Sequence, residues 1–176
     1  MKQSLFKWVM APLVACALLA PAQVMGQAVN IQAKGWHLSE VLPGVLCVNA
    51  SGSVRVLGYA HIVKFESADS RLAGRGIAVL NQEPQADGTI TFEGTGSLEL
   101  GTWDSNGIFT RTDGGVWDAK FSGVVKVDGT LEYRFSGRGI GGSIDSLHIV
   151  MTATKASTDP TVPYLFSAKI TGVAGK

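Results

Sequence analysis

The feature that most constrains the fold is a period of two in the apolar residues, which runs through most of the chain from about residue 50 onward. Between Leu131 and Phe135, for example, apolar residues alternate with Glu132 and Arg134. Such alternation gives each segment one apolar and one polar face, which is typical of a half-buried antiparallel strand. The clearest segments are 90–100, 117–122, 131–136 and 164–171.

Turn signals separate these segments at intervals of about 8–14 residues, as expected for a meander of hairpins. Pairs such as Asp-Gly favour tight hairpin turns because glycine adopts positive φ without a steric cost. The signals are Asp87-Gly88, Ser105-Asn106-Gly107, Asp113-Gly114-Gly115, Asp128-Gly129 and Gly141-Gly142. Helical periodicity is scarce, and LSEVL at Leu38–Leu42 is the one candidate for a short helical turn.

Glycine also occurs inside the strand patterns, at Gly94, Gly96, Gly123, Gly137 and Gly139. Glycine weakens a strand, so its presence there indicates bulges, sharp bends or close approach of another group. A sheet that closes on itself needs such bends. We therefore predict an all-β fold, a single antiparallel closed or nearly closed barrel of about eight strands. The alternative is a flat sandwich with glycines at its loop ends.

The N-terminus has the features of a secretory signal. Two lysines in MKQSLFK precede an uncharged apolar run from Trp8 to Ala20, and Ala20-Pro21-Ala22 supplies a cleavage site. The run is shorter than the ~20 residues of a membrane-spanning helix. We predict a signal peptide at 1–22, a barrel domain at 23–176, and export to the bacterial periplasm or the exterior without stable membrane insertion. A buried N-terminal helix is one alternative, and a lipid anchor on Cys16 after Leu13-Val14-Ala15 is another.

Charge and cysteine content exclude several classes of function. Without Lys2 and Lys7 the chain has 13 basic and 14 acidic residues, a net charge of −1. That balance provides no electrostatic footprint for nucleic acid. Cys47 is then the single cysteine, flanked by apolar residues as a small buried side chain would be. One cysteine and three scattered histidines give no metal-ligand spacing, and no nucleotide-binding motif occurs, so we expect no metal and no cofactor.

A small barrel either is filled by side chains or retains an apolar cavity with a few polar groups. His61 is the notable titratable residue, because it shares a strand face with Leu57, Tyr59, Val63 and Phe65. We predict His61 and Tyr59 to be a catalytic pair that accepts and donates a proton. The alternative is a core histidine satisfied by a backbone carbonyl. The predicted substrate-binding residues are Leu57, Phe65, Phe92, Trp117, Phe121 and Tyr133.

The segment from Thr89 to Lys155 resembles the allene oxide cyclase-like and dirigent-like barrels. The resemblance lies in short strands with G-x-G breaks, as in FEGTGSLELG and YRFSGRGIGGSIDSLHIVMTAT. It implies a cup that holds an apolar substrate and guides its rearrangement without a cofactor. No motif position matches, so no catalytic residue is transferred from the resemblance.

These observations favour an exported barrel that binds a small hydrophobic molecule, terpenoid-like or fatty-acid-like, and acts as a cofactor-independent isomerase, cyclase or lyase. Two alternatives remain: a carrier that binds the molecule without catalysis, and a structural surface module whose barrel is filled. The sequence leaves self-association open.

Overall fold

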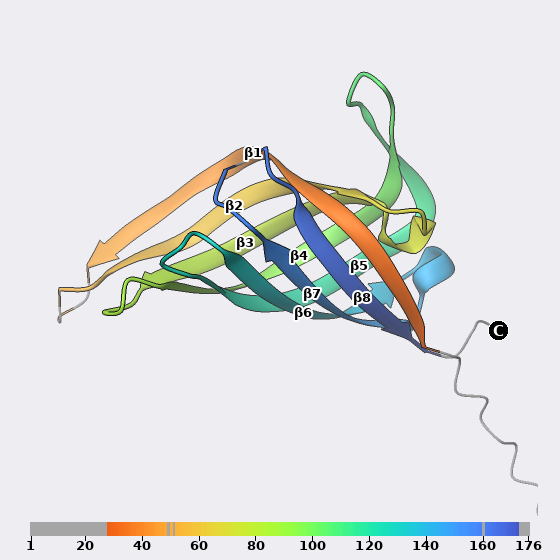
Figure 1. Cartoon of the computed structure of the whole chain (residues 1–176). Helices are drawn as coiled ribbons and strands as arrows, with labels where there is room; N and C mark the ends of the chain where they lie inside the picture. The colour runs from red at the N-terminus through yellow and green to blue at the C-terminus, as the bar shows by residue number, and fades with distance from the viewer. Residues whose placement is uncertain (1–27, 49, 51, 160, 173–176) are drawn as a thin grey trace, which may run out of the picture.

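The computed structural model describes residues 28–48, 50, 52–159 and 161–172. Eight antiparallel strands, each hydrogen-bonded to the next in chain order, form one sheet (Figure 1). Two single-turn 3-10 helices, η1 (Ser70–Leu72) and η2 (Gly142–Ile144), lie between strands. The strands are β1 (Val29–Val48), β2 (Val54–Glu66), β3 (Gly74–Pro84), β4 (Ile90–Trp103), β5 (Phe109–Val125), β6 (Leu131–Ile140), β7 (His148–Lys155) and β8 (Tyr164–Thr171).

The sheet closes into a barrel because the first strand pairs with the last. The β1–β8 register runs from Val29 opposite Ile170 to Gly35 opposite Tyr164. The predicted closed eight-strand barrel is thereby confirmed, and the sandwich alternative is wrong. Closure gives every strand an inward and an outward face, so alternate residues enter the lumen.

Aspartate side chains stabilise two of the predicted hairpin turns. At the β3–β4 and β5–β6 turns, the carboxylates of Asp87 and Asp128 accept the backbone N–H groups of Thr89 and Thr130, at 3.0 and 2.8 Å. The turn predicted at 113–115 is wrong, because β5 continues through it. Gly115 there has φ +103°, and its backbone approaches the Gly141 carbonyl too closely for a Cβ. These glycines therefore mark a close approach within the barrel wall rather than a chain reversal.

The helical turn predicted at Leu38–Leu42 is also wrong, because the segment belongs to β1. Register shifts lie between His37 and Ser39 and between Glu40 and Leu42. Each shift moves the following side chains to the other face, so the period of two is lost there. These irregularities explain why the alternation is lost after His37, whereas it is regular before them, from Val29 to Gly35.

The interior glycines make room for aromatic rings. A Cβ at Gly123 would overlap the ring of Phe92, and one at Gly94 would lie 2.9 Å from Cζ of Phe121. The rings of Phe92 and Phe121 therefore occupy space that a side chain on β4 or β5 would otherwise fill. The Tyr133 ring packs on that of Phe92, with ring centroids 4.6 Å apart. The glycines thus position the aromatic residues that fill this half of the lumen.

The two ends of the barrel differ. The end that carries η1 and η2 is closed by fully buried side chains, Leu72 from η1 and Ile144 from η2, packed near Trp117. The Trp117 indole N–H donates to the Arg71 carbonyl at 2.7 Å, so the buried ring is satisfied. The opposite end, which neither 3-10 helix covers and which we call the open end, carries the β1–β2, β3–β4, β5–β6 and β7–β8 connections (Figure 1).

The predicted leader at 1–22, its cleavage site and Cys16 fall outside the described residues, so export and lipidation stay predictions. Within the described ranges, no helix is long and apolar enough to cross a membrane.

Candidate functional site

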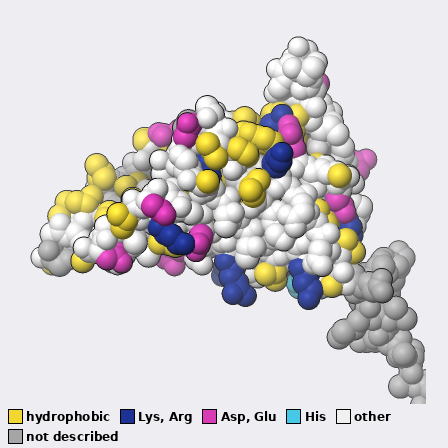
Figure 2. Space-filling view, in the orientation of Figure 1, with side chains coloured by type: hydrophobic (Ala, Val, Ile, Leu, Met, Phe, Trp, Pro, Cys, Tyr) yellow, Lys and Arg dark blue, Asp and Glu magenta, His cyan; other side chains and the backbone are white. Residues whose placement is uncertain are grey.

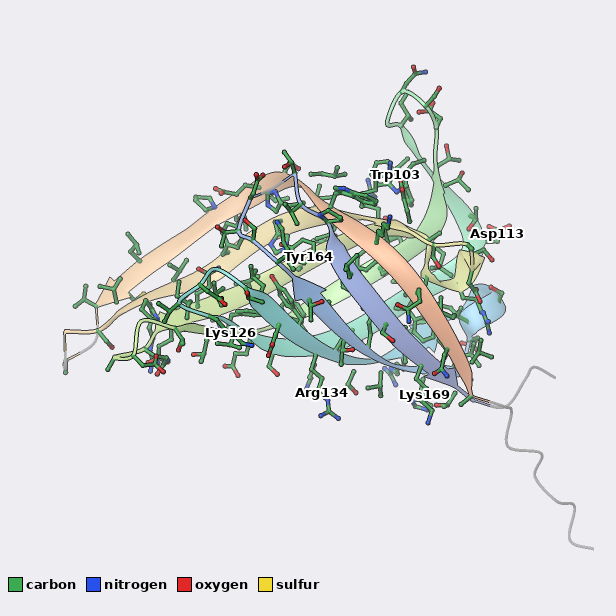
Figure 3. All side chains as sticks on the ribbon, viewed as in Figure 1. Trp103, Asp113, Lys126, Arg134, Tyr164 and Lys169 are labelled. Atoms are coloured by element: carbon green, nitrogen blue, oxygen red, sulfur yellow. The ribbon has the colours of Figure 1, made fainter. Side chains whose placement is uncertain are left out.

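A cavity of about 70 Å³ lies inside the barrel. An apolar protein cavity that holds benzene measures about 150 Å³, so the space as it stands holds a small group or part of a ligand. Its lining is nearly all apolar or aromatic, and Figure 3 shows Tyr164 on the inner side of the ribbon, whereas Arg134 and Lys169 point away from it. The large lining side chains are His61, Phe65, Leu98, Trp117, Phe121, Tyr133, Phe135, Met151, Tyr164 and Phe166.

His61 is the polar residue that β2 places in this lining. Its side chain is 7% exposed, and its Nδ1 is buried without a hydrogen-bond partner in the part of the chain that the structure describes. An unpaired buried acceptor costs about 1–3 kcal/mol. Burial, followed by the charge of His37, lowers the pKa of His61 to about 4. The imidazole is therefore neutral at pH 7, and its buried Nδ1 is available to a hydrogen-bond partner.

His37 and Tyr59 extend this group toward the open end of the barrel. The ring centroids of His37 and Tyr59 lie 5.1 and 5.4 Å from that of His61. The Tyr59 hydroxyl lies 3.4 Å from His37 Nε2. Burial and then the Lys155 charge lower the pKa of His37, with Glu40 opposing, whereas burial and then Glu40 raise the pKa of Tyr59. All three rings are thus neutral at pH 7 and can exchange hydrogen bonds with a polar ligand group.

Lys155 faces inward at the end of β7 and is 3% exposed. Its Nζ lies 4.7 Å from the centroid of the Tyr164 ring, a cation–π contact. None of the ion pairs found in the described ranges includes it. Burial lowers the pKa of Lys155, and the nearby Asp159 carboxylate opposes that shift. The open end therefore holds a buried amine next to the histidines.

Tyr133 and Tyr164 stand edge to face between this amine and the cavity, with ring centroids 5.5 Å apart. Burial is the first cause that raises the pKa of each hydroxyl, and the proximity of Tyr164 raises that of Tyr133 further. Both phenols stay protonated and can donate hydrogen bonds at neutral pH.

The structure brings together most of the residues predicted for the site. Of these, His61, Phe65, Trp117, Phe121 and Tyr133 line the cavity. Tyr59 contacts the His61 ring without lining the cavity, and Phe92 packs behind Tyr133.

Leu57 is separated from the others and is 39% exposed. Gly58 at φ +68° and a register shift between Val56 and Tyr59 interrupt the alternation. Leu57 and Tyr59 therefore do not share the strand face that the sequence alternation predicted for them.

Sequence reasoning did not assign His37, Lys155 or Tyr164 to the site. Lys155 had a usable signal, because the period of two from Ile149 through Met151 and Ala153 reaches it on the apolar face. His37 had one as well, because the alternation through Ile31, Ala33 and Gly35 reaches it before the first register shift of β1.

Over the described ranges, no group of three or more His, Cys, Asp or Glu side chains could hold a metal ion. Cys47 is a half-buried free thiol in the distal part of β1.

Neither a family model nor a curated protein matches the chain.

Proposed function

We propose that the barrel binds a small, mainly apolar molecule that carries one hydrogen-bond donor, and that His61 Nδ1 accepts from that donor. The observation that carries this proposal is the unpaired, buried Nδ1 in an otherwise apolar lining. A ligand donor would recover the hydrogen bond that the fold leaves unmade. The apolar walls would contribute the binding energy, and the single nitrogen would set orientation.

His61 and Tyr59 together support proton transfer as a second stage of the proposal. His61 would take a proton from one atom of the ligand and return it to another, so that the ligand is isomerised without a cofactor. Tyr59, whose hydroxyl lies 3.4 Å from His37 Nε2 outside the cavity lining, would donate a hydrogen bond to the oxygen that gains charge if the ligand reaches beyond the cavity toward it. A pKa of about 4 makes His61 a weak base, so proton abstraction requires a ligand with an acidified hydrogen. This low basicity favours binding over catalysis as the primary role.

The small volume of the cavity supports a second candidate, a structural module whose lumen is essentially filled. Ligand entry needs Met151, an adaptable side chain, or a neighbouring ring to move. The two candidates differ in whether any small apolar molecule is retained.

Phenol and toluene provide the test, because they have nearly the same shape and differ in one hydroxyl donor. We expect phenol to bind about tenfold more tightly than toluene, the value of one hydrogen bond, with shifts of the His61 ring signals in NMR. In His61→Phe the preference should disappear or reverse in favour of toluene, because the phenol hydroxyl then gives up its hydrogen bonds to water without a partner at this position. The Met151→Ala variant, with a larger cavity, should bind both probes more tightly while keeping the preference.

Equal affinities in the native chain would contradict the role of Nδ1. Failure of both probes to bind, even to Met151→Ala, would favour the filled module. A proton-transfer role would further require solvent deuterium to enter a bound ligand in the native chain and not in His61→Phe or Tyr59→Phe.

A further inference from the structure

The β1–β2 hairpin extends beyond the closed part of the barrel. Pairing of β1 with β8 ends at Gly35, whereas β1 continues to Val48 with β2 as its one neighbour in the described sheet. On the other side, the pairing of β2 with β3 reaches only to Val56. Figure 1 shows this ribbon projecting from the open end. We call residues 41–48 and 54–57 the apolar arm.

The arm is apolar on both of its faces. Val45 and Leu46 lie in a regularly paired part of the ribbon and are 65% and 72% exposed, although neighbours in a strand point to opposite faces. Val41 and Leu42, beside the register shift, are 51% and 55% exposed. Val48, Val54 and Leu57 are exposed as well. No charged residue occurs from Val41 to Val54. Figure 2 shows hydrophobic side chains gathered over this projecting end.

We propose that the apolar arm docks on the surface of a lipid bilayer, at the depth of the boundary between headgroups and acyl chains. A protein partner that packs on one face of a two-stranded ribbon leaves the other face in water. A lipid environment can cover both. Arg55, the one charged residue of the arm, is ion-paired with Glu83 of β3 at 2.7 Å, so the arm carries no unpaired charge. Its attraction to the bilayer is therefore hydrophobic and independent of anionic lipid.

Pairing with a second copy along the free edge of β1 is disfavoured by the strand itself. Pro43 lacks an N–H group, and two register shifts lie just before it at His37–Ser39 and Glu40–Leu42. Proline and bulges are devices by which natural edge strands avoid further pairing. The occupant that fits the arm is therefore the bilayer.

Docking by the arm would place the open end of the barrel next to lipid. Pro43 at the base of the arm lies opposite Tyr59, and Glu40 lies opposite His61. This supplies a source for the apolar ligand, a consequence that rests on the proposed function. The docking itself does not depend on it.

Flotation of residues 23–176, without the predicted signal peptide, with phosphatidylcholine vesicles tests the proposal. We expect binding that is unchanged by 0.5 M salt or by added phosphatidylglycerol, within about twofold. The double variant Leu46→Asp/Val48→Asp should lose about tenfold or more in partition. The control Val150→Asp/Leu165→Asp introduces the same two charges at exposed residues, 44% and 54%, on the outer wall of the barrel and should retain binding.

Three outcomes would overturn the inference: no flotation of the native chain, equal loss in both double variants, or binding that requires anionic lipid. A concentration-dependent dimer that sediments without vesicles and is lost in the arm variant would assign the arm to a second copy instead. Thermal melts of both variants establish that they are folded. Phenol binding should survive in the arm variant and vesicle binding in His61→Phe, so failure of one proposal is distinguishable from failure of the other.

Discussion

The two ends of the barrel differ in the polarity of their buried side chains. At the end closed by η1 and η2, large apolar side chains are fully buried and the indole N–H groups of Trp117 and Trp103 donate to backbone carbonyls. At the open end, an unpaired imidazole nitrogen and a buried amine lie among phenols and a second histidine. Buried polar groups reduce stability unless they are satisfied. We infer that the closed end stabilises the fold, whereas the open end gives up stability for recognition.

The largest expected effect separates the ends directly. Trp117→Ala removes a 2%-exposed ring from the closed end and should lower the free energy of unfolding by about 3–5 kcal/mol. His61→Phe at the open end fills a similar volume and removes the unpaired nitrogen, so its free energy of unfolding should change by less than about 1 kcal/mol or rise. Urea denaturation measures both. A larger loss in His61→Phe than in Trp117→Ala would reverse the assignment of the two ends.

Acid should weaken the molecule through the open end. The pKa of His61 is about 4 in the folded chain, below its ordinary value of 6.5, so the unfolded chain binds the proton more tightly. The free energy of unfolding should therefore fall as the pH decreases from about 6.5 to about 4, by about 3 kcal/mol in all. The lowered pKa of His37 acts in the same direction.

Urea midpoints between pH 7 and pH 4 measure this loss. In His61→Phe most of the pH dependence over that range should disappear. An unchanged slope would mean that the imidazole is charged or paired inside the barrel.

The sequence predicted the architecture well because its signals are local. The alternation around Tyr133 and the Asp128-Gly129 turn depend on a few neighbouring residues, and they define strands and hairpins without knowledge of the rest. Closure was indicated by glycines such as Gly94, whose missing Cβ admits an aromatic ring.

The site was harder to predict because it depends on register between distant strands. Pairing of Gly35 with Tyr164 brings opposite ends of the chain together, and no local pattern specifies which residues then meet. A bulge beside Gly58 moved Leu57 away from Tyr59, and the register shifts directly after His37 interrupt the alternation that leads up to it. Irregular backbone at the open end thus both builds the site and conceals it.

The smallest expected effect tests whether the buried amine belongs to the same group as the histidines. Lys155→Met keeps the apolar stem and removes the charge that lowers the pKa of His37, so that pKa should rise toward 6.5. Relief of the amine's burial and loss of its contact with Tyr164 oppose each other, so the free energy of unfolding should change by less than about 1 kcal/mol. NMR titration of the His37 ring measures the shift, and Lys169→Met on the outer wall is the matched control. A His37 pKa that is equal in both variants would separate Lys155 from the histidines, and the open end would then hold two independent polar features.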